Sequence, residues 1–131
     1  GGGEVGCETA AFLGMVQKGA TVVEMKPTLM EELDGVSKEN LLQIMNRFHV
    51  KSFTSTKVLE IKEKSVVVEM IDGVKELPCD CVVLAMGYKP DDTLANELET
   101  AGIKVHKIAG AVKTSNALIA NREGFELGMK L

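Results

Sequence analysis

The chain has little of what marks several common protein classes, with three cysteines and two histidines among its 131 residues. An odd number of cysteines, with Cys79 and Cys81 only two positions apart, does not suggest a disulfide framework. His49 and His106 stand singly, so neither forms a ligand pair for a metal or activates a nearby thiol. We therefore expect small buried thiols, no metal site and no catalytic side chain.

Strong charge of one sign and long apolar runs are also absent. The net charge is -4, with lysine and glutamate interleaved, which leaves no basic stripe for DNA or RNA. No apolar run is long enough to span a bilayer, and the N-terminus lacks the layout of a signal peptide. These absences predict a cytoplasmic protein with neither a nucleic acid nor a membrane as partner. A length of 131 residues with 45% hydrophobic content suits one ordinary core.

Apolar periodicity predicts alternating helices and strands. Helices are expected over 4–18 with Gly19 as the stop, around 41–48 with Ser37 as the cap, at 94–98, and from Ser115 onward. Strands are expected at 20–25, 58–61, 66–71, 74–77, 81–86 and 103–108, with Asp72-Gly73 as a hairpin turn. The fold class is therefore α/β. We expect a Rossmann-like parallel sheet containing Val22 and Val83, flanked by helices, and a separate antiparallel excursion at about 56–77.

A glycine-rich loop opens the chain directly before the first predicted helix. The run from Gly1 to Gly6 satisfies the dinucleotide-binding pattern G-x-G-x-x-G. In that pattern Gly1 makes the tight turn, Gly3 lets a pyrophosphate approach the backbone, and Gly6 allows close packing of the helix. The backbone amides of Glu4, Val5 and Gly6, at the positive end of the helix dipole, are expected to bind the pyrophosphate.

An acidic residue stands where this pattern requires one, about twenty positions after the glycines. Glu24, at the end of the second strand, is expected to accept hydrogen bonds from the adenosine ribose hydroxyls. Its charge would repel a 2′-phosphate, so NAD(H) is favoured over NADP(H), while Lys26 opposes that preference. Met25, between them, completes this part of the predicted site. The alternative interpretation is a structural glycine turn followed by a solvated glutamate.

The strand that should precede Gly1 in such a fold is not in this sequence. We therefore expect a fragment whose first helix and Glu24 strand adjoin an empty position in the sheet. Unpaired strand edges favour pairing with another copy. A homo-oligomer or a strand swap through this edge is accordingly one possible partner arrangement.

Two segments resemble a known family. Gly1 to Ala10 and Thr21 to Met25 are similar to the pyridine-nucleotide-disulfide-oxidoreductase-type module. The similarity is greatest to the C-terminal half of 2-enoate reductases, 2,4-dienoyl-CoA reductases and related NADH:flavin oxidoreductases, including NADH oxidases. It covers nearly the whole chain and implies an antiparallel excursion after the second helix. It also implies that Gly87, after a returning strand, lies near the dinucleotide.

The resemblance implies a parent enzyme that moves hydride from NADH to FAD and then to an enoate-type or other acceptor. Residues 1–87 would be the incomplete NAD(P)-binding domain, and 88–131 a return segment and terminal helix resembling part of the FAD-binding domain. Where the family has Ile-Gly-Asp, this chain has Ile108-Ala109-Gly110, so Gly110 lacks the carboxylate that meets the flavin. The isolated chain is expected to be inactive. The competing interpretation is a non-catalytic binding or assembly module.

Overall fold

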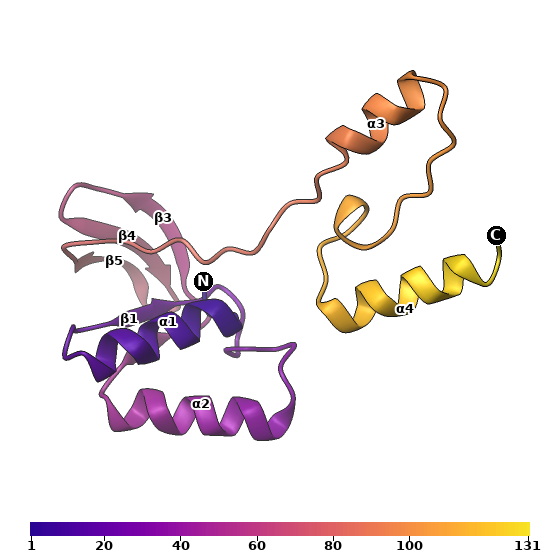
Figure 1. Ribbon diagram of the computed structural model, residues 1–131. Coiled ribbons are helices and arrows are strands. Elements are labelled where there is room, and N and C mark those ends of the chain that lie inside the picture. Colours follow the sequence, from indigo (N-terminus) through magenta and orange to yellow (C-terminus); the bar gives the residue numbers. More distant parts are fainter. The chain divides into compact units, whose positions relative to one another are not determined.

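The computed structural model describes all residues from Gly1 to Leu131, and they form two compact units. The first unit, Gly1–Met86, contains α1 (Glu4–Met15), β1 (Thr21–Val23), α2 (Gly35–Arg47), β2 (Lys51–Phe53), β3 (Lys57–Ile61), β4 (Ser65–Met70) and β5 (Gly73–Pro78) (Figure 1). The second unit, Gly87–Leu131, contains α3 (Thr93–Thr100), the short 3-10 helix η1 (Ala109–Ala111) and α4 (Ala117–Gly128). No helix is both long enough and apolar enough to cross a membrane.

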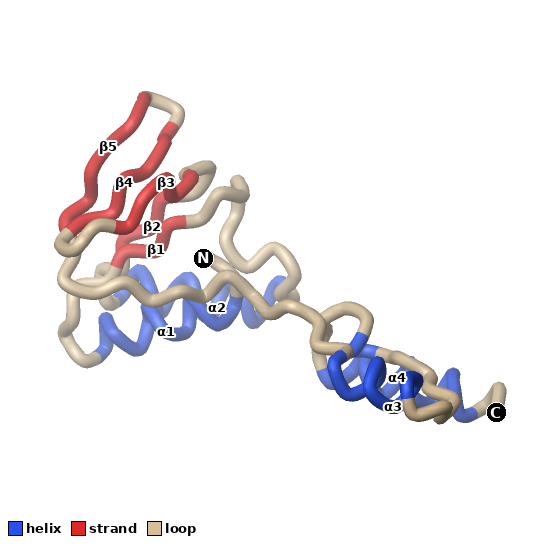
Figure 2. Tube along the Cα trace, turned by 90° about the horizontal axis from the view of Figure 1, so that it is seen from above, coloured by secondary structure: helices blue, strands red, loops and turns tan.

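The first unit is built around a parallel strand pair. β1 and β2 lie side by side, with Thr21 opposite Lys51 and Val23 opposite Phe53, and α2 connects them. A parallel pair needs such a crossover, because a short turn cannot return the chain to the same end of the sheet. α1 contacts both α2 and β1, and the two helices lie on the same side of the strand pair (Figures 1 and 2). This arrangement confirms the predicted Rossmann-like parallel sheet with flanking helices.

Small side chains bring α1 close to the core. Cys7, Ala10 and Ala11 are its buried residues, and they pack with side chains from β1, α2 and the segment after β1. The remaining buried members of this cluster are Val22, Leu29, Met30 and Met45. By contrast, the apolar positions that predicted the helix lie on its exposed side, where Phe12 is 61% exposed. The helix was correctly predicted, but its buried face is the one with small residues.

Two predicted helix boundaries are wrong. α1 ends at Met15, and the turn that follows places Gln17 at φ 59°, so Gly19 is not the stop. α2 begins at Gly35 because Asp34 caps it: one carboxylate oxygen accepts from the amides of Val36 at 3.1 Å and Ser37 at 3.0 Å. Ser37, the predicted cap, lies inside the first turn and is itself capped.

The antiparallel excursion is confirmed. β4 lies between β3 and β5, and its Val68 is fully buried. Met70 pairs with Gly73, so the two residues between them form the hairpin loop. The hairpin was predicted, but its loop is one residue earlier than Asp72-Gly73: Gly73, with φ 117° in a conformation that favours glycine, is the first residue of β5.

Two predicted strands are absent. Residues 81–86 form no strand, so Val83 does not belong to the parallel sheet, and 103–108 form none either. An apolar run becomes a strand only where a neighbour supplies backbone hydrogen bonds, and no segment of this chain pairs with these two. Conversely, β2 was not predicted, because Lys51-Ser52-Phe53 is too short and polar to show a strand pattern.

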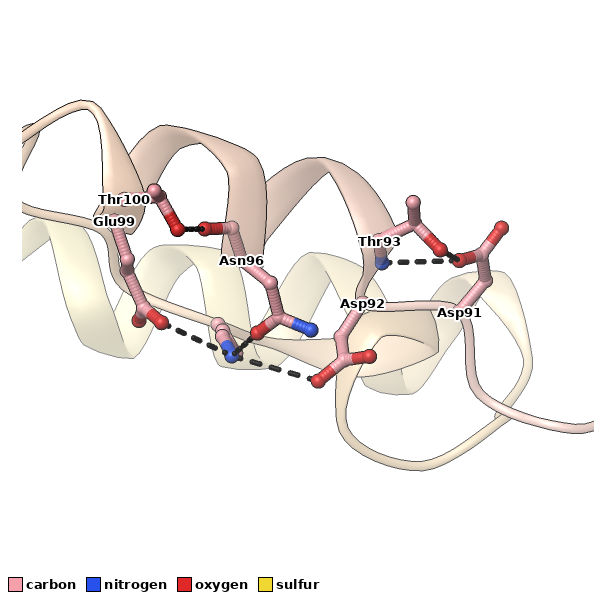
Figure 3. Close-up of polar contacts among 7 residues, drawn as sticks. Asp91, Asp92, Thr93, Asn96, Glu99 and Thr100 are labelled. Atoms are coloured by element: carbon pink, nitrogen blue, oxygen red, sulfur yellow. Dashed lines mark hydrogen bonds and ion pairs between the residues drawn. The ribbon is translucent and has the colours of Figure 1, made fainter.

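In the second unit, polar contacts tie an extended segment to α3 (Figure 3). The Lys107 ammonium donates to the side-chain oxygen Oδ1 of Asn96 at 2.7 Å and lies 3.4 Å from carboxylates of both Asp92 and Glu99. At the start of α3, one Asp91 oxygen accepts from the Thr93 amide at 3.1 Å and from its hydroxyl at 2.7 Å. Both predicted helices of this region, α3 and α4, are confirmed.

Candidate functional site: the glycine loop and Glu24

The glycine loop leads directly into α1, and several backbone amides at this helix start have no hydrogen-bond partner. Gly3 is the N-cap in an extended conformation, and no side chain caps the helix. The first amide of the helix to find a partner is that of Cys7, which donates to the Gly3 carbonyl at 3.0 Å. The amides of Glu4, Val5 and Gly6 donate to no protein acceptor. Free amides at the positive end of a helix are suited to an anionic group.

Gly2 is the residue through which this loop is held. Its amide donates to Glu24 Oε2 at 2.6 Å, and its carbonyl accepts from the Met30 amide at 2.8 Å and from Cys7 Sγ at 3.5 Å. One residue thus joins the loop to Glu24 at the end of β1, to the segment after it and to α1. The dinucleotide-binding pattern assigns no role to this position. The only signal in the sequence is a third glycine in the run.

Three of the loop glycines are required by close approach. A Cβ at Gly1 would lie 2.1 Å from the Ala85 carbonyl oxygen, and one at Gly6 would lie 2.0 Å from the Gly1 carbonyl oxygen. A Cβ at Gly2 would lie 2.8 Å from Cβ of Glu24. At Gly3 a Cβ would meet no atom within 4 Å, which leaves open space next to the free amides.

The Glu24 carboxylate is held on both sides. Oε2 accepts from the Gly2 amide, and Oε1 accepts from the Lys26 amide at 2.8 Å. Burial alone would raise the pKa of Glu24, but these two amides, aided by nearby positive charge, lower it below the usual range. The group is therefore an anion at neutral pH. Each oxygen keeps a free lone pair with which it could accept from a hydroxyl.

Lys26 is engaged with a different acid. Its ammonium lies 2.6 Å from Glu31 Oε2, and its carbonyl accepts from the Ser55 amide at 2.9 Å. Through the Glu24 carboxylate, which accepts from the amides of both Gly2 and Lys26, the structure brings Lys26 and Glu24 together with the glycine loop. The Met25 side chain is 74% exposed and contacts none of these groups through a hydrogen bond. Gly87, with φ 80°, begins the second unit.

The thiols have no activating neighbour. Burial raises the pKa of Cys7, so it is a neutral thiol at pH 7, and its weak hydrogen bond goes to the Gly2 carbonyl. Two shallow depressions of the surface lie along α3 and α2, and neither involves the glycine loop. The loop and Glu24 thus present backbone donors and carboxylate acceptors close to one another.

Comparison with known proteins agrees with this geometry. Residues 1–121 match the family described as pyridine nucleotide-disulphide oxidoreductase. The bilirubin reductase of Mediterraneibacter gnavus (strain CC55_001C) is 37% identical over 105 residues, which are 80% of this chain and 16% of that protein. The NADH oxidase of Thermoanaerobacter brockii is 31% identical over 135 residues, covering 100% of this chain and 20% of that protein.

Among solved structures, a complex of 2-naphthoyl-CoA reductase with 2-naphthoyl-CoA superposes with a TM-score of 0.86 at 25% identity. The match covers 100% of this chain and 20% of that one. The chain therefore spans about a fifth or less of the length of these proteins. From the glycine loop, the parallel strand pair and this match over most of its length, the chain belongs to the pyridine nucleotide-disulphide oxidoreductase family.

Proposed function

We propose that this chain is the nicotinamide-dinucleotide-binding segment of an FAD-dependent NADH oxidoreductase. Three free amides at the start of α1 lie beside a loop whose Gly2 amide is bound by an ionised Glu24. The hydrogen bond between Gly2 and Glu24 carries the proposal, because it holds donors for a pyrophosphate next to acceptors for ribose hydroxyls. In this assignment Gly1, Gly3 and Gly6 shape the loop, and Glu24 selects NAD(H) over NADP(H).

The chain's own residues bind and orient the cofactor, and the hydride chemistry belongs to the cofactors. We propose that hydride passes from NADH to FAD and then to an acceptor held elsewhere in the full-length protein. An enoate- or enoyl-type acceptor is one candidate, since the superposed reductase was solved with 2-naphthoyl-CoA. We place contact with the rest of the flavoenzyme, or a strand swap between copies, at the edge of β1 that does not pair with β2.

We assign the second unit to the return segment of the FAD-binding domain, without a flavin-contacting side chain. Gly110 stands at the position where the family has an acidic residue, and it has no side chain with which to contact a flavin. Its carbonyl accepts from the Asp91 amide at 3.2 Å. The nearby carboxylate of Glu123 already accepts from the Ala109 amide at 2.7 Å. Any contribution of this segment to the flavin is therefore proposed to come from its backbone.

Anaerobic titration of NADH and NADPH fluorescence with the full-length protein tests the assignment, with the flavin reduced beforehand so that no hydride is transferred. Losing a charged acceptor costs about 1.5 to 3 kcal/mol, so Glu24→Ala should weaken NADH binding by roughly ten- to a hundredfold. NADPH should be affected much less. Glu24→Gln keeps one acceptor oxygen but not the charge, so it should reduce the ratio of the NADPH to the NADH dissociation constant.

Glu39→Ala is the matched control, because Glu39 is an exposed carboxylate on α2 that forms no side-chain hydrogen bond or ion pair. It should change neither dissociation constant. Equal or tighter binding of NADPH by the unmodified protein would contradict the role of Glu24. Absence of binding to either nucleotide would favour a non-catalytic assembly module, in which the loop is only a structural turn.

A further inference from the structure

Lys26 is a cation that could favour NADP(H) at this site, but its ammonium is paired with a carboxylate. Its amide is hydrogen-bonded to Glu24, so its side chain starts beside the carboxylate proposed to select the ribose. A lysine in that place would attract a 2′-phosphate. In the structure, however, the ammonium contacts Glu31, with Nζ and Oε2 separated by 2.6 Å.

The position of Glu31 is set by its neighbours in the chain. Leu29 and Met30 are buried in the core of the first unit, with exposed fractions of 6% and 2%. The Met30 amide donates to the Gly2 carbonyl, so the segment is bonded to the glycine loop itself. Glu31, the next residue, is thereby presented toward Lys26. The ion pair is a consequence of the same anchoring that orders the loop.

We propose that Glu31 is a specificity-determining residue, which engages Lys26 and so withholds it from a 2′-phosphate. This inference rests on the proposed function, because it concerns the choice between two dinucleotides at the loop. Glu24 then excludes NADP(H) by repulsion, and Glu31 does so by pairing with the lysine beside Glu24 that would offset that repulsion. The two acids act on the same choice through different partners.

The expected effect is modest. The Lys26 and Glu31 side chains are 50% and 52% exposed, and ion pairs at such sites are weakened by solvent. Freeing the lysine should therefore tighten binding of the 2′-phosphorylated form by about three- to tenfold relative to the unphosphorylated form.

Calorimetric titration of the full-length protein with NAD⁺ and NADP⁺ tests this, since these oxidised forms bind without reducing a flavin. Glu31→Gln should lower the ratio of the NADP⁺ to the NAD⁺ dissociation constant by about three- to tenfold. Glu32→Gln is the matched control, because it removes the same charge from the next residue, which forms no ion pair. It should change the ratio by less than about twofold. The double variant Glu31→Gln with Lys26→Met should return the ratio to that of the unmodified protein, because the released lysine is no longer present.

The remaining outcomes overturn the inference. If NAD⁺ binds but Glu31→Gln leaves the ratio unchanged, Glu31 does not restrain Lys26. If Glu32→Gln has an equal effect, general charge rather than the ion pair sets the ratio. If the double variant keeps the gain, Lys26 is not the group released. If the unmodified protein binds neither NAD⁺ nor NADP⁺, the proposed function itself is wrong and this inference fails with it.

Discussion

Gly2 and Gly3 are adjacent but have different surroundings, and this separates a structural from a binding role. Gly2 is buried, and an added methyl would lie 2.5 Å from Leu29 Cδ2 and 2.8 Å from Glu24 Cβ. Relieving such overlap costs about 1 to 3 kcal/mol in well-packed regions. We expect Gly2→Ala to lower the free energy of unfolding by that amount, as measured by urea denaturation.

Gly3→Ala is the control for this prediction. Gly3 already has an extended backbone with φ -71°, and an added methyl would meet no atom within 4 Å. Its cost to stability should be under about 1 kcal/mol, the usual range for a change at a helix cap. If the two variants are equally stable, the close packing around Gly2 is not what the structure indicates.

Glu24 should make the stability of the loop sensitive to acid. Its pKa in the folded protein is lowered: burial acts in the opposite direction, but the amides of Lys26 and Gly2 outweigh it. A carboxylate of this kind stabilises the fold above its unfolded pKa, about 4.3, and loses that contribution as the pH falls through the folded pKa. Between about pH 5 and pH 3, unfolding free energy should therefore fall less steeply in Glu24→Gln than in the unmodified protein.

Other carboxylates with lowered pKa values remain in that variant, so the comparison rests on the difference in slope. Asp72, paired with Lys75, is one of them. Identical slopes for the unmodified protein and Glu24→Gln would show that the Gly2 and Lys26 amides do not bind this carboxylate in solution.

At the scale of single residues, the sequence predicts what depends on spacing along the chain. Glu24 could be placed because strand, helix and glycine loop keep a regular separation in dinucleotide-binding folds. The hydrogen bonds of Gly2 and the pairing of Lys26 with Glu31 could not be placed. They depend on how the segment after β1 folds back on the loop, and no periodic pattern encodes that path.

At the scale of elements, the strands that pair with near neighbours were predicted correctly. β2, whose partner lies far away in the sequence, was missed, and the two predicted runs that have no partner form no strand. β3, β4 and β5 carry apolar and β-branched residues and join through short turns, so each element's partner is the next one. The run at 81–86 has the composition of a buried strand, yet it has no partner in this chain. Composition shows that a segment can be extended, whereas hydrogen bonding decides whether it is a strand.

The start of α4 gives a prediction at this scale. The Asn116 side-chain oxygen accepts from the Ile119 amide at 3.0 Å, and it is the side chain that caps this helix. Asn116→Ala should cost about 1 kcal/mol of helix stability, whereas Asn116→Ser retains a capping oxygen. Hydrogen exchange of the Ile119 amide should be faster by about fivefold in the alanine variant. Equal protection of the Ile119 amide from exchange in Asn116→Ala and Asn116→Ser would mean that Asn116 is not the cap.

For the whole molecule, the division into two units predicts where a protease cuts first. Residues 79–92 form no helix or strand, and Tyr88 within them is 80% exposed. Irregular, exposed segments are the usual sites of proteolytic cleavage. Brief treatment with chymotrypsin should cut after Tyr88 and release two fragments, to be identified by mass spectrometry. A first cut within β3 to β5, or within α1, would contradict the division.

The buried thiol of Cys7 also makes the glycine loop measurable from outside. A reagent that alkylates thiols needs access and ionisation, and Cys7 has neither while its side chain is fully buried against the Gly2 carbonyl. Cys81 is exposed in the same chain and supplies an internal reference rate. The ratio of the two alkylation rates therefore reports how often the loop moves away from α1, so an unreactive buried cysteine becomes a probe of opening at the proposed dinucleotide-binding loop.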